Sequence, residues 1–316
     1  MTSQPAMKTP DLLCLGGLAL DLLLRAPDVP QRDEKLVVEF AGRHGGGLVA
    51  NAACAAAQLG LSTAWAGPVG DDEYGQVCLA DFARFGVDTG FAVKIPGAAT
   101  SFCVILLTPG GERTILVANT LPVPPPLSTE VRICLSQAPL VYTLLYQAGW
   151  FQQVAAQVHA GGGKVAVDIE ASSANQDVPL KDSLQYADLV FCSASGLRWA
   201  SGQHDLERGA RTIQSCGPEL VVVTLGNQGA FALSGAEQVF QPAYPAAVVD
   251  TTGAGDCFHA ACLLGIRRSW SLQYMLRFAS AAAALSVQAE GARGRLPDRP
   301  TVEEFLRSVG ERVVMI

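Results

Sequence analysis

Late in the chain the sequence reads Val249-Asp250-Thr251-Thr252-Gly253-Ala254-Gly255-Asp256-Cys257-Phe258-His259, between a strand-like run and an apolar, helix-like run. Gly253, Ala254 and Gly255 are small, so their backbone N–H groups are unshielded where a helix is expected to begin. Unpaired N–H groups and the helix dipole bind anions at such a position. Asp256 follows at once and can accept a proton from a hydroxyl. The stretch therefore predicts an anion site beside a base, the arrangement that phosphoryl transfer requires.

The same residues have a simpler interpretation, a glycine turn in which Asp256 caps the helix. In either case the helix dipole favours the charged carboxylate, so the sequence predicts a lowered pKa for Asp256 and a weak base. Phosphoryl transfer tolerates a weak base, because its loose transition state needs little early proton removal. The choice between the two interpretations depends on the other segments of the chain.

Those segments alternate short apolar runs with longer helical patterns, which predicts a parallel sheet with helices on both faces. The expected strands are Leu12–Leu15, Ser62–Ala66, Leu140–Thr143, Val165–Asp168, Leu189–Phe191 and Leu220–Leu225. The expected helices are Ala50–Leu59, Gly75–Phe85, Gln152–Ala160 and Leu206–Cys216. The fold class is therefore α/β, a doubly wound, mostly parallel sheet in a single domain over residues 1–316.

Three strand patterns interrupt the alternation. Lys35–Phe40 has no helix after it, and Ser101–Leu107 and Thr114–Ala118 flank Pro109-Gly110-Gly111-Glu112, which predicts a β-hairpin. These strands would form a small β-sheet inserted at about residues 33–44 and 98–119. Open α/β sheets bind ligands at the carboxyl ends of their strands, so a small sheet inserted there would be a lid.

Composition excludes several classes of protein. The net charge is -7 and no Lys/Arg cluster offsets it, so a nucleic-acid partner is not expected. No apolar run approaches the roughly 20 residues of a membrane helix, and Met1–Pro10 lacks the apolar core of a signal peptide. The 9 cysteines are scattered without a Cys-x-x-Cys pair and the 4 histidines show no metal spacing. Reduced thiols in a cytoplasmic protein are expected, and no metal is assigned to these side chains.

Two segments nearer the N-terminus carry groups suited to a polyol. His44-Gly45-Gly46-Gly47 precedes a helix of small residues, and Gly46 and Gly47 would let a ligand approach the backbone. Asn51 would present a bidentate amide to vicinal hydroxyls, and Asp21, shortly after the first expected strand, could accept hydrogen bonds from them. The simpler interpretations are a flexible loop before a packed helix and a solvated loop carboxylate.

A third segment, Thr224-Leu225-Gly226-Asn227-Gln228-Gly229, ends a predicted strand in a tight turn. Thr224 and the free N–H groups around Gly226 and Gly229 could meet a nucleotide there. An ordinary β-turn is the other interpretation.

Taken in order, these segments resemble the PfkB, or ribokinase-like, carbohydrate kinases over nearly the whole chain, from about Leu12 to Leu306. The family landmarks present are Gly46-Gly47 with Asn51, Gly67–Gly75, Gly86-Val87-Asp88 and Asp250–Asp256. The last of these resembles the C-terminal signature of the family and is highly specific. With the other landmarks present, a simple turn with a cap at Asp256 loses most of its support.

The resemblance implies ATP-dependent phosphorylation of a hydroxymethyl group, with Mg²⁺ on the nucleotide phosphates, in a doubly wound fold with a β lid. Asp256 would be the base, and Gly253, Ala254 and Gly255 would form the anion hole. The residues that would hold the sugar are Asp21, Gly46, Gly47 and Asn51. Those along the nucleotide would be Thr224, Gly226 and Gly229, with Ser280 near the adenine. Relatives often pair through the lid, so a homodimer is expected.

Two positions near the phosphates depart from the family pattern. Ser193-Ala194-Ser195-Gly196 stands where relatives usually have Asn-x-x-Glu, which organises the hydrated Mg²⁺. Some fructokinase and sulfofructose-kinase relatives look similar there. Ser193 is then expected on the cofactor side, with the metal left to water, phosphates and Asp168 or Glu170. Arg295 aligns with a ribokinase serine beside the K⁺ site of some relatives, and its guanidinium would replace the cation, which argues against K⁺ dependence.

The sugar side also departs from the pattern. Leu48 stands where many relatives have a polar residue, so the pocket is expected to be less polar there. Lys35 falls where the sulfofructose-kinase branch has a lysine that faces the substrate, and Gly291–Asp298 also resembles that branch. Leu140–Gln147 offers no arginine for a sulfonate, so that specificity is not carried over. Lys35 either faces an anionic group or is a solvated lid lysine.

Two alternatives to a sugar kinase stay open. A nucleoside kinase on the same fold would need an aromatic platform, and the lid supplies mainly Phe40 and Phe102 while aromatic residues total 7%, which favours a sugar. A catalytically weak sugar-binding sensor is suggested by Ser193-Ala194-Ser195-Gly196, and the intact Asp256 argues against it. A dehydrogenase is excluded, because no Gly-x-Gly-x-x-Gly follows the first strand.

Overall fold

The apolar runs of the chain form a nine-stranded sheet with the order β13-β12-β11-β10-β9-β8-β1-β4-β5. The computed structural model describes residues 9–109, 113–171 and 180–313. The strands are β1 (Leu12–Leu15), β4 (Thr63–Gly70), β5 (Asp88–Ile95), β8 (Leu140–Leu144), β9 (Lys164–Ile169), β10 (Leu189–Ser193), β11 (Leu220–Thr224), β12 (Ala230–Ser234) and β13 (Glu237–Gln241). Neighbours from β5 to β11 pair in parallel, and β12 and β13 add an antiparallel edge. The predicted mostly parallel sheet is confirmed.

Helices cover both faces of this sheet, because successive strand residues point to opposite sides. In β1, Leu12 and Cys14 belong to one buried cluster, and Leu13 and Leu15 to the other. The first cluster takes in α1 (Leu48–Gln58), α2 (Glu73–Phe85), α8 (Ala254–Arg267), α9 (Leu272–Ser286) and α10 (Arg299–Ser308). The second takes in α3 (Thr129–Leu135), α4 (Ala148–Ala160), α5 (Leu180–Leu184), α6 (Ala194–Ser201) and α7 (Leu206–Gln214). Within the described ranges, no helix is long and apolar enough to cross a bilayer.

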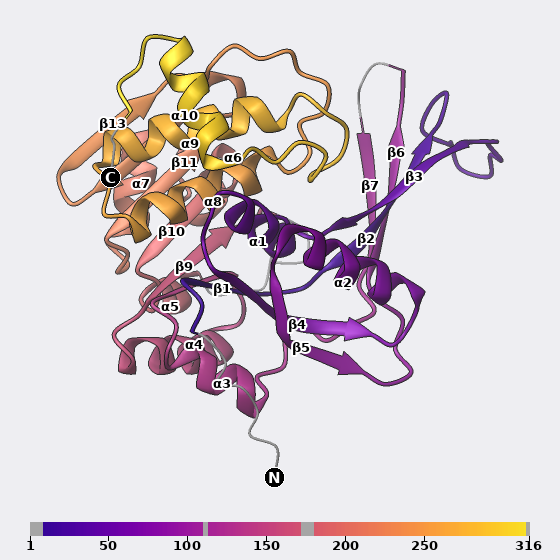
Figure 1. Ribbon diagram of the computed structural model, residues 1–316, viewed down its shortest axis with the longest axis horizontal. Helices are drawn as coiled ribbons and strands as arrows, with labels where there is room; N and C mark the ends of the chain where they lie inside the picture. Colours follow the sequence, from indigo (N-terminus) through magenta and orange to yellow (C-terminus); the bar gives the residue numbers. More distant parts are fainter. Residues whose placement is uncertain (1–8, 110–112, 172–179, 314–316) are drawn as a thin grey trace.

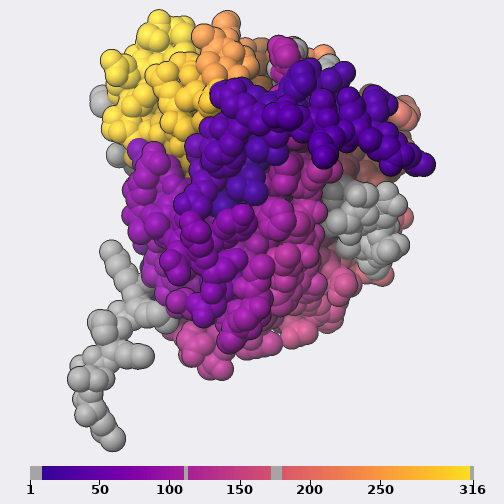
Figure 2. All heavy atoms as spheres, turned by 90° about the vertical axis from the view of Figure 1, so that its right-hand side faces the viewer, coloured from indigo at the N-terminus to yellow at the C-terminus, as the bar shows by residue number. Residues whose placement is uncertain are grey.

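A second sheet has the order β3-β2-β6-β7. Its strands are β2 (Ala19–Arg25), β3 (Glu39–Gly46), β6 (Phe102–Leu107) and β7 (Arg113–Ala118). The inner strands β2 and β6 pair in parallel, and the two outer pairs are antiparallel. Figure 1 shows this sheet standing to the right of the large one. Figure 2, seen from that side, shows its indigo part beside the yellow C-terminal segment. This second sheet is the lid.

The lid differs from expectation in two strands. The strand expected at Lys35–Phe40 begins only at Glu39, and it continues to Gly46, so the glycine run is the end of a strand instead of a loop. Strand β2 was not predicted. It belongs to the lid, so part of the lid comes from residues that precede residue 33. The cause is tertiary: β2 is held between β3 and β6, and pairing across such distances leaves little trace in the local pattern. Residues 110–112 of the predicted hairpin turn lie outside the described residues.

The segment before α8 also differs from expectation. Strand β13 ends at Gln241, and no strand leads directly into α8. The backbone N–H groups of Val249 and Asp250 instead donate to the carbonyl of Val287, at 2.8 and 3.2 Å. The segment that follows α9 is thereby held against the segment that precedes α8, and both flank the predicted anion site.

Candidate active site

Helices α1 and α8 each begin at a glycine, which has no side chain to cap them. Gly47 precedes α1 with φ 94°, and Gly253 precedes α8 with φ 74°, a left-handed conformation that favours glycine. Several other helices carry a capping side chain that accepts a hydrogen bond from the first turn, as at Asp72, Ser193 and Ser271, whereas α4 begins at Gln147 without such a bond. An uncapped start leaves backbone donors for a ligand. Both uncapped glycines belong to the segments that the sequence predicted as binding sites.

The start of α8 is closely packed on one side and open on the other. A Cβ atom at Gly253 would lie 2.7 Å from the Cβ of Ala292, whereas one at Gly255 would meet nothing within 4 Å. The N–H of Ala254 donates to the carbonyl of Thr251 at 3.3 Å, so one predicted anion donor already has a partner within the turn. The open side lies at Gly255, where the backbone has room for an anion.

Asp256 lies in the first turn of α8 and is only 4% exposed. Its Oδ2 accepts a hydrogen bond of 2.8 Å from Asn51 Nδ2 of α1. Burial raises the pKa of Asp256 to about 7, against the lowering effects of the Asn51 hydrogen bond and the Arg293 charge. The predicted lowering by the helix dipole is therefore wrong, because loss of water outweighs it. A pKa near neutrality suits a general base.

Asp21 lies on β2 and is also buried, which excludes the simpler interpretation of a solvated loop carboxylate. Its register partner on β6 is Cys103. A Cβ at Gly46 would collide with the Asp21 carboxylate, which explains why a glycine stands there. Burial raises the pKa of Asp21, while the Cys103 thiol and the Arg293 and His44 charges oppose the rise. The structure thus brings Asp21, Gly46, Asn51 and Asp256 together, and their contact with a sugar stays a prediction.

Arg293 joins this group and was not among the predicted site residues. It is 7% exposed, and each of its three nitrogens donates a hydrogen bond. Nε donates to Asn51 Oδ1 at 3.0 Å, Nη1 to Asp81 Oδ2 at 2.6 Å and Nη2 to the Gly46 carbonyl at 3.3 Å. A lone arginine in Gly-Ala-Arg-Gly normally indicates a solvated loop, so the local sequence held no signal for its burial.

The residues predicted on the nucleotide side lie at the carboxyl ends of β10 and β11. Ser193 and Thr224 are register partners there. Ser193 Oγ accepts a hydrogen bond of 3.1 Å from the Gly196 N–H and lies 2.8 Å from Ser195 Oγ, so it caps α6. Thr224 Oγ1 donates to the Cys192 carbonyl at 3.5 Å.

The other residues predicted on the nucleotide side, Gly226, Gly229 and Ser280, lie in a turn and on a helix. Gly226 and Gly229 flank a 3-10 turn with φ 60° and 116°, and a Cβ at Gly229 would collide with the carbonyl of Gln241. Ser280 is buried on α9, and its Oγ has no hydrogen-bond partner in the described part of the chain. Contact of these residues with a nucleotide stays a prediction.

Asp168 is buried, and its carboxyl group contacts two other buried side chains, Tyr142 and His259. Tyr142 OH donates to its Oδ2 at 3.4 Å, and His259 Nδ1 lies 3.6 Å from the same oxygen. Burial raises the pKa of Asp168 well above its usual value and lowers the pKa of His259 to about 3, so the imidazole is neutral near pH 7. Glu170, the other carboxyl expected near Mg²⁺, directly follows β9 and is half-buried. Among the described residues no group of three or more His, Cys, Asp or Glu is arranged to hold a metal ion.

Two lid arginines contact the segment that precedes α8 and the segment that follows α9, which both flank the predicted anion site. Arg113 Nη1 of β7 donates to Thr252 Oγ1 at 2.6 Å and to Asp250 Oδ1 at 3.3 Å. Arg25 Nη2 of β2 donates to Glu290 Oε1 at 3.0 Å. Asp250 also accepts from the Gly291 N–H at 2.8 Å, which joins the two segments. The lid is therefore tied to both segments that flank the predicted anion site.

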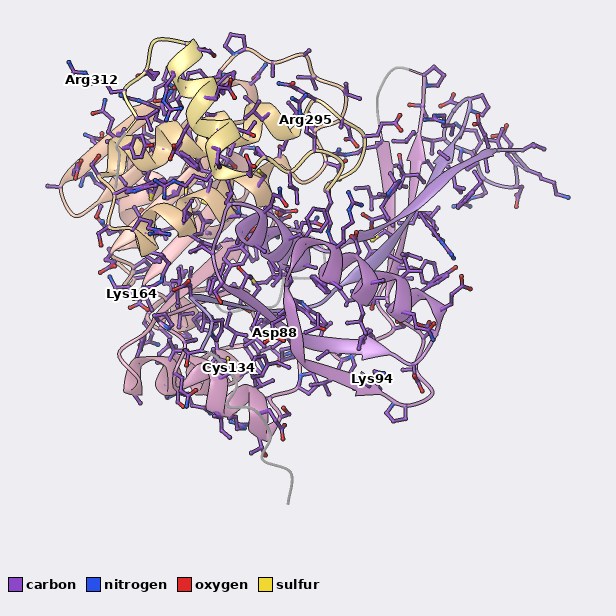
Figure 3. All side chains as sticks on the ribbon, viewed as in Figure 1. Asp88, Lys94, Cys134, Lys164, Arg295 and Arg312 are labelled. Atoms are coloured by element: carbon purple, nitrogen blue, oxygen red, sulfur yellow. The ribbon has the colours of Figure 1, made fainter. Side chains whose placement is uncertain are left out.

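The structure does not bring Lys35 or Arg295 to these groups. Lys35 is exposed in the connection between β2 and β3, which projects from the outer end of the lid in Figure 1. Arg295 is exposed on the segment between α9 and α10 (Figure 3), where its Nη1 donates to Gln288 Oε1 at 2.7 Å. Replacement of K⁺ by the Arg295 guanidinium stays a prediction.

Comparison with known proteins places this geometry in a family. Residues 9–299 match the family described as pfkB family carbohydrate kinase. Ribokinase of Arabidopsis thaliana is 28% identical over 312 residues, which cover 94% of this chain and 81% of that protein. Fructoselysine 6-kinase of Escherichia coli (strain K12) is 31% identical over 251 residues, covering 78% of this chain and 91% of that protein.

The comparison with solved structures also finds ribokinases. The structure of Arabidopsis thaliana ribokinase complexed with ribose and ATP has a TM-score of 0.83 and 26% identity, and the match covers 95% of this chain and 99% of that one. A putative ribokinase II from E. coli in complex with ATP and Mg²⁺ shares the fold, with a TM-score of 0.80 at 24% identity over 94% of this chain and 99% of that one. The chain belongs to the pfkB family of carbohydrate kinases and is an ATP-dependent sugar kinase of the ribokinase type.

Proposed function

We propose that this kinase transfers the γ-phosphoryl group of ATP to a hydroxymethyl group of its sugar, with Asp256 as the base. The observation that carries the proposal is a buried carboxyl in the first turn of a helix with no side-chain cap. With a pKa of about 7, Asp256 can take up the proton of a hydroxyl and release it again near neutral pH.

In the proposed reaction the hydroxyl oxygen of the sugar attacks the γ-phosphorus of ATP. The new O–P bond forms while the bond to the β-phosphate oxygen breaks, the hydroxyl proton passes to Asp256, and ADP leaves. The N–H groups of Gly253, Ala254 and Gly255 and the dipole of α8 stabilise the charge on the transferring group, and for this the Ala254 N–H must leave its 3.3 Å bond to the Thr251 carbonyl. Asn51 holds the base in place through its 2.8 Å hydrogen bond.

On the sugar side we propose Asp21, Gly46, Gly47 and Asn51 as contacts, since buried carboxylate and amide groups suit vicinal hydroxyls. Lys35 would reach the substrate only after movement of the connection between β2 and β3. The lid gives little support for a nucleoside, because Phe40 is 61% exposed and Phe102 packs edge-on against Tyr74, with centroids 6.1 Å apart. A stacking platform for a base would have to be built from these rings.

On the nucleotide side we propose that Thr224, Gly226 and Gly229 lie along the nucleotide, with Ser193 near its phosphates and Ser280 near the adenine. Mg²⁺, when bound with ATP, would neutralise charge on the phosphates. The oxygen groups of this edge fit such an ion only partly, because Asp168 faces the interior and Ser193 caps α6. Glu170 is the carboxyl we assign to the metal, with phosphates and water as the other ligands.

We further propose a single domain over residues 1–316 that forms a homodimer through the lid. The edge strands β3 and β7 expose apolar side chains, among them Phe40, Leu116 and Val117 at 61%, 58% and 62%. Unpaired edges with apolar side chains favour pairing with a second copy. The nine free thiols support a location in the reducing cytoplasm. Light scattering of the wild type against Leu116→Lys would test the dimer, which should become a monomer.

One experiment tests the reaction. The protein is incubated with Mg·ATP and a panel of ketoses, aldoses, sugar phosphates and nucleosides, and ADP release is followed, with Asp256→Asn as the control. A sugar should give ADP well above the control. A nucleoside that outruns every sugar would identify a nucleoside kinase. Binding of several sugars without ADP above the control would identify a sensor, for which the use of Ser193 as a cap is the supporting observation.

A further inference from the structure

Arg293 is a buried cation that connects four elements of the molecule. It lies on the segment after α9 and donates to Asn51 of α1, Asp81 of α2 and the carbonyl of Gly46 at the end of β3. Its guanidinium carbon also lies 5.4 Å from the centre of the Phe82 ring. A buried guanidinium is tolerated only when its donors are satisfied, and here all three nitrogens have acceptors.

An ion pair with Asp81 would suffice to neutralise this cation, at a distance of 2.6 Å. The other two donors of Arg293 instead go to Asn51 and Gly46, which belong to the two segments predicted on the sugar side. Asn51 and Gly46 are the residues that contact Asp256 and Asp21. Arg293 therefore supports both buried carboxyls indirectly, through its hydrogen bonds to Asn51 and Gly46.

The bond to Asn51 has a directional consequence. An asparagine amide has one acceptor oxygen and one donor nitrogen, and an arginine only donates. With Arg293 Nε held 3.0 Å from Asn51 Oδ1, the Asn51 Nδ2 must face Asp256. An unsupported amide could turn over and present its oxygen to the carboxylate, which would repel it. Arg293 thus fixes which end of the amide meets Asp256.

We infer that Arg293 is a positioning residue for phosphoryl transfer, which orients the Asn51 amide toward Asp256 and holds the end of lid strand β3 at Gly46. The inference rests on the proposed role of Asp256 as the base. Arg293 acts through Asn51 and touches neither substrate nor the reacting atoms in this account.

Charge adds to this positioning. The titratable groups around Asp256 are Asp21 on β2, Tyr142 on β8, Asp168 on β9, Glu170 after β9, Cys257 and His259 on α8, and Arg293. Burial is the main cause of the raised pKa of Asp256. The charges of Glu170 and Asp21 raise this pKa further, and the charge of Arg293 lowers it. Removal of Arg293 should therefore raise the pKa of Asp256 above its present value of about 7.

The first test compares the pH dependence of kcat/KM in wild type, Arg293→Gln, Arg293→Lys and Asp81→Asn, with the best sugar from the panel. Arg293→Gln should lower kcat about 10- to 100-fold with the KM for Mg·ATP within about twofold, and should move the acid limb to higher pH. Arg293→Lys keeps the charge without the fork of donors, so kcat should fall while the acid limb stays. Asp81→Asn should lower the melting temperature and leave the acid limb in place.

Loss of rate and stability in parallel in Arg293→Gln and Asp81→Asn, with the acid limb unmoved, would make Arg293 a structural ion pair and overturn the inference. In the Asn51→Ala background, Arg293→Gln should have little further effect on kcat; a full additional loss would also overturn it. Asp256→Asn separates the two proposals, because equal ADP release with and without the Asp256 carboxyl would refute the base itself.

A second test needs no substrate. The free energy of unfolding is measured for wild type, Asp256→Asn, Arg293→Gln and the double variant at about pH 5 and about pH 8.5. Folded Asp256 is protonated at the lower pH and charged at the higher one, since its pKa is about 7. Coupling between the two positions should appear at the higher pH and nearly vanish at the lower one. Absence of coupling at the higher pH would overturn the inference, and the equally neutral Arg293→Met replaces Arg293→Gln if the latter does not fold.

Discussion

Helix α8 begins at a glycine, whereas helix α6 begins at a serine that caps it. Gly253 has no side chain, so the backbone donors at the start of α8 are left for a ligand. Ser193 accepts the Gly196 N–H at 3.1 Å, so the start of α6 satisfies one of its own donors. The difference supports the proposal that the start of α8 is the anion site, and it shows that Ser193 stabilises the first turn of α6.

The same contrast separates two buried carboxyls. Asp256 accepts from Asn51 and lies beside the open side at Gly255, whereas Asp168 is enclosed with Tyr142 and His259. Burial raises the pKa of both. A raised pKa alone therefore does not identify the base, and access to an open site has to accompany it.

The largest expected effect is that of Asp256→Asn, which removes the base and keeps the shape. We expect kcat to fall about 10²- to 10⁴-fold in the ADP-release assay. The folded pKa of about 7 lies above the 3.8 of an unperturbed aspartate, so the buried charge lowers stability progressively between those values and fully above pH 7. Asp256→Asn should therefore be more stable than wild type above pH 7. A kcat within tenfold of wild type would place the base elsewhere.

The open side of α8 can be tested by Gly255→Ala. Its Cβ would meet nothing within 4 Å, so we expect normal folding but a loss of about 10²-fold in kcat, because the methyl group occupies the proposed phosphate position. Gly253→Ala is the comparison variant. Its φ of 74° and its packing against Ala292 should lower the free energy of unfolding by about 1–2 kcal/mol or more. Full activity of a folded Gly255→Ala would move the anion site away from this side.

The pH dependence of kcat/KM in the wild type is expected to be a smaller and more gradual effect than those of the substitutions above. Only the carboxylate form of Asp256 accepts a proton, so kcat/KM should rise about tenfold per pH unit below about pH 7 and level off above it. Initial rates across this range, with saturating Mg·ATP, measure the limb. A limb near the ordinary aspartate value of 3.8 would mean that burial does not control the base in the working enzyme.

The smallest expected effect is that of Ser193→Ala, which tests the capped helix start. Loss of the cap should lower the free energy of unfolding by about 1 kcal/mol, and the KM for Mg·ATP should rise only about two- to threefold. Ser271→Ala, which removes the 3.3 Å cap of α9, is the matched control with the same stability loss and an unchanged KM. A loss of kcat in Ser193→Ala that excess Mg²⁺ restores would make Ser193 a metal ligand.

Much of the large sheet could be predicted, because its strands are continuous apolar runs and its helices follow local signals. The predicted bounds of β1 were those observed, and α2 ends at Phe85 as expected, before Gly86 in a left-handed conformation. Strand β2 was missed, because its pairing with β3 and β6 depends on residues far away in the chain. Such pairing decides whether a leucine-rich run becomes a strand or a loop.

The candidate site also combines features that the sequence predicts with features that depend on distant residues. The sequence alone determined the reaction class, through a glycine-rich helix start followed by an aspartate together with the family landmarks in the other segments, since such patterns act on the backbone within a few residues. Only the tertiary structure decided that Asp256 has a raised pKa, that Asp168 faces the interior and that Arg293 supports Asn51. These properties arise from burial and from contacts between residues 205 and 242 positions apart, such as Asn51 with Asp256 and with Arg293. Desolvation and contacts of this range exist only once the chain has folded.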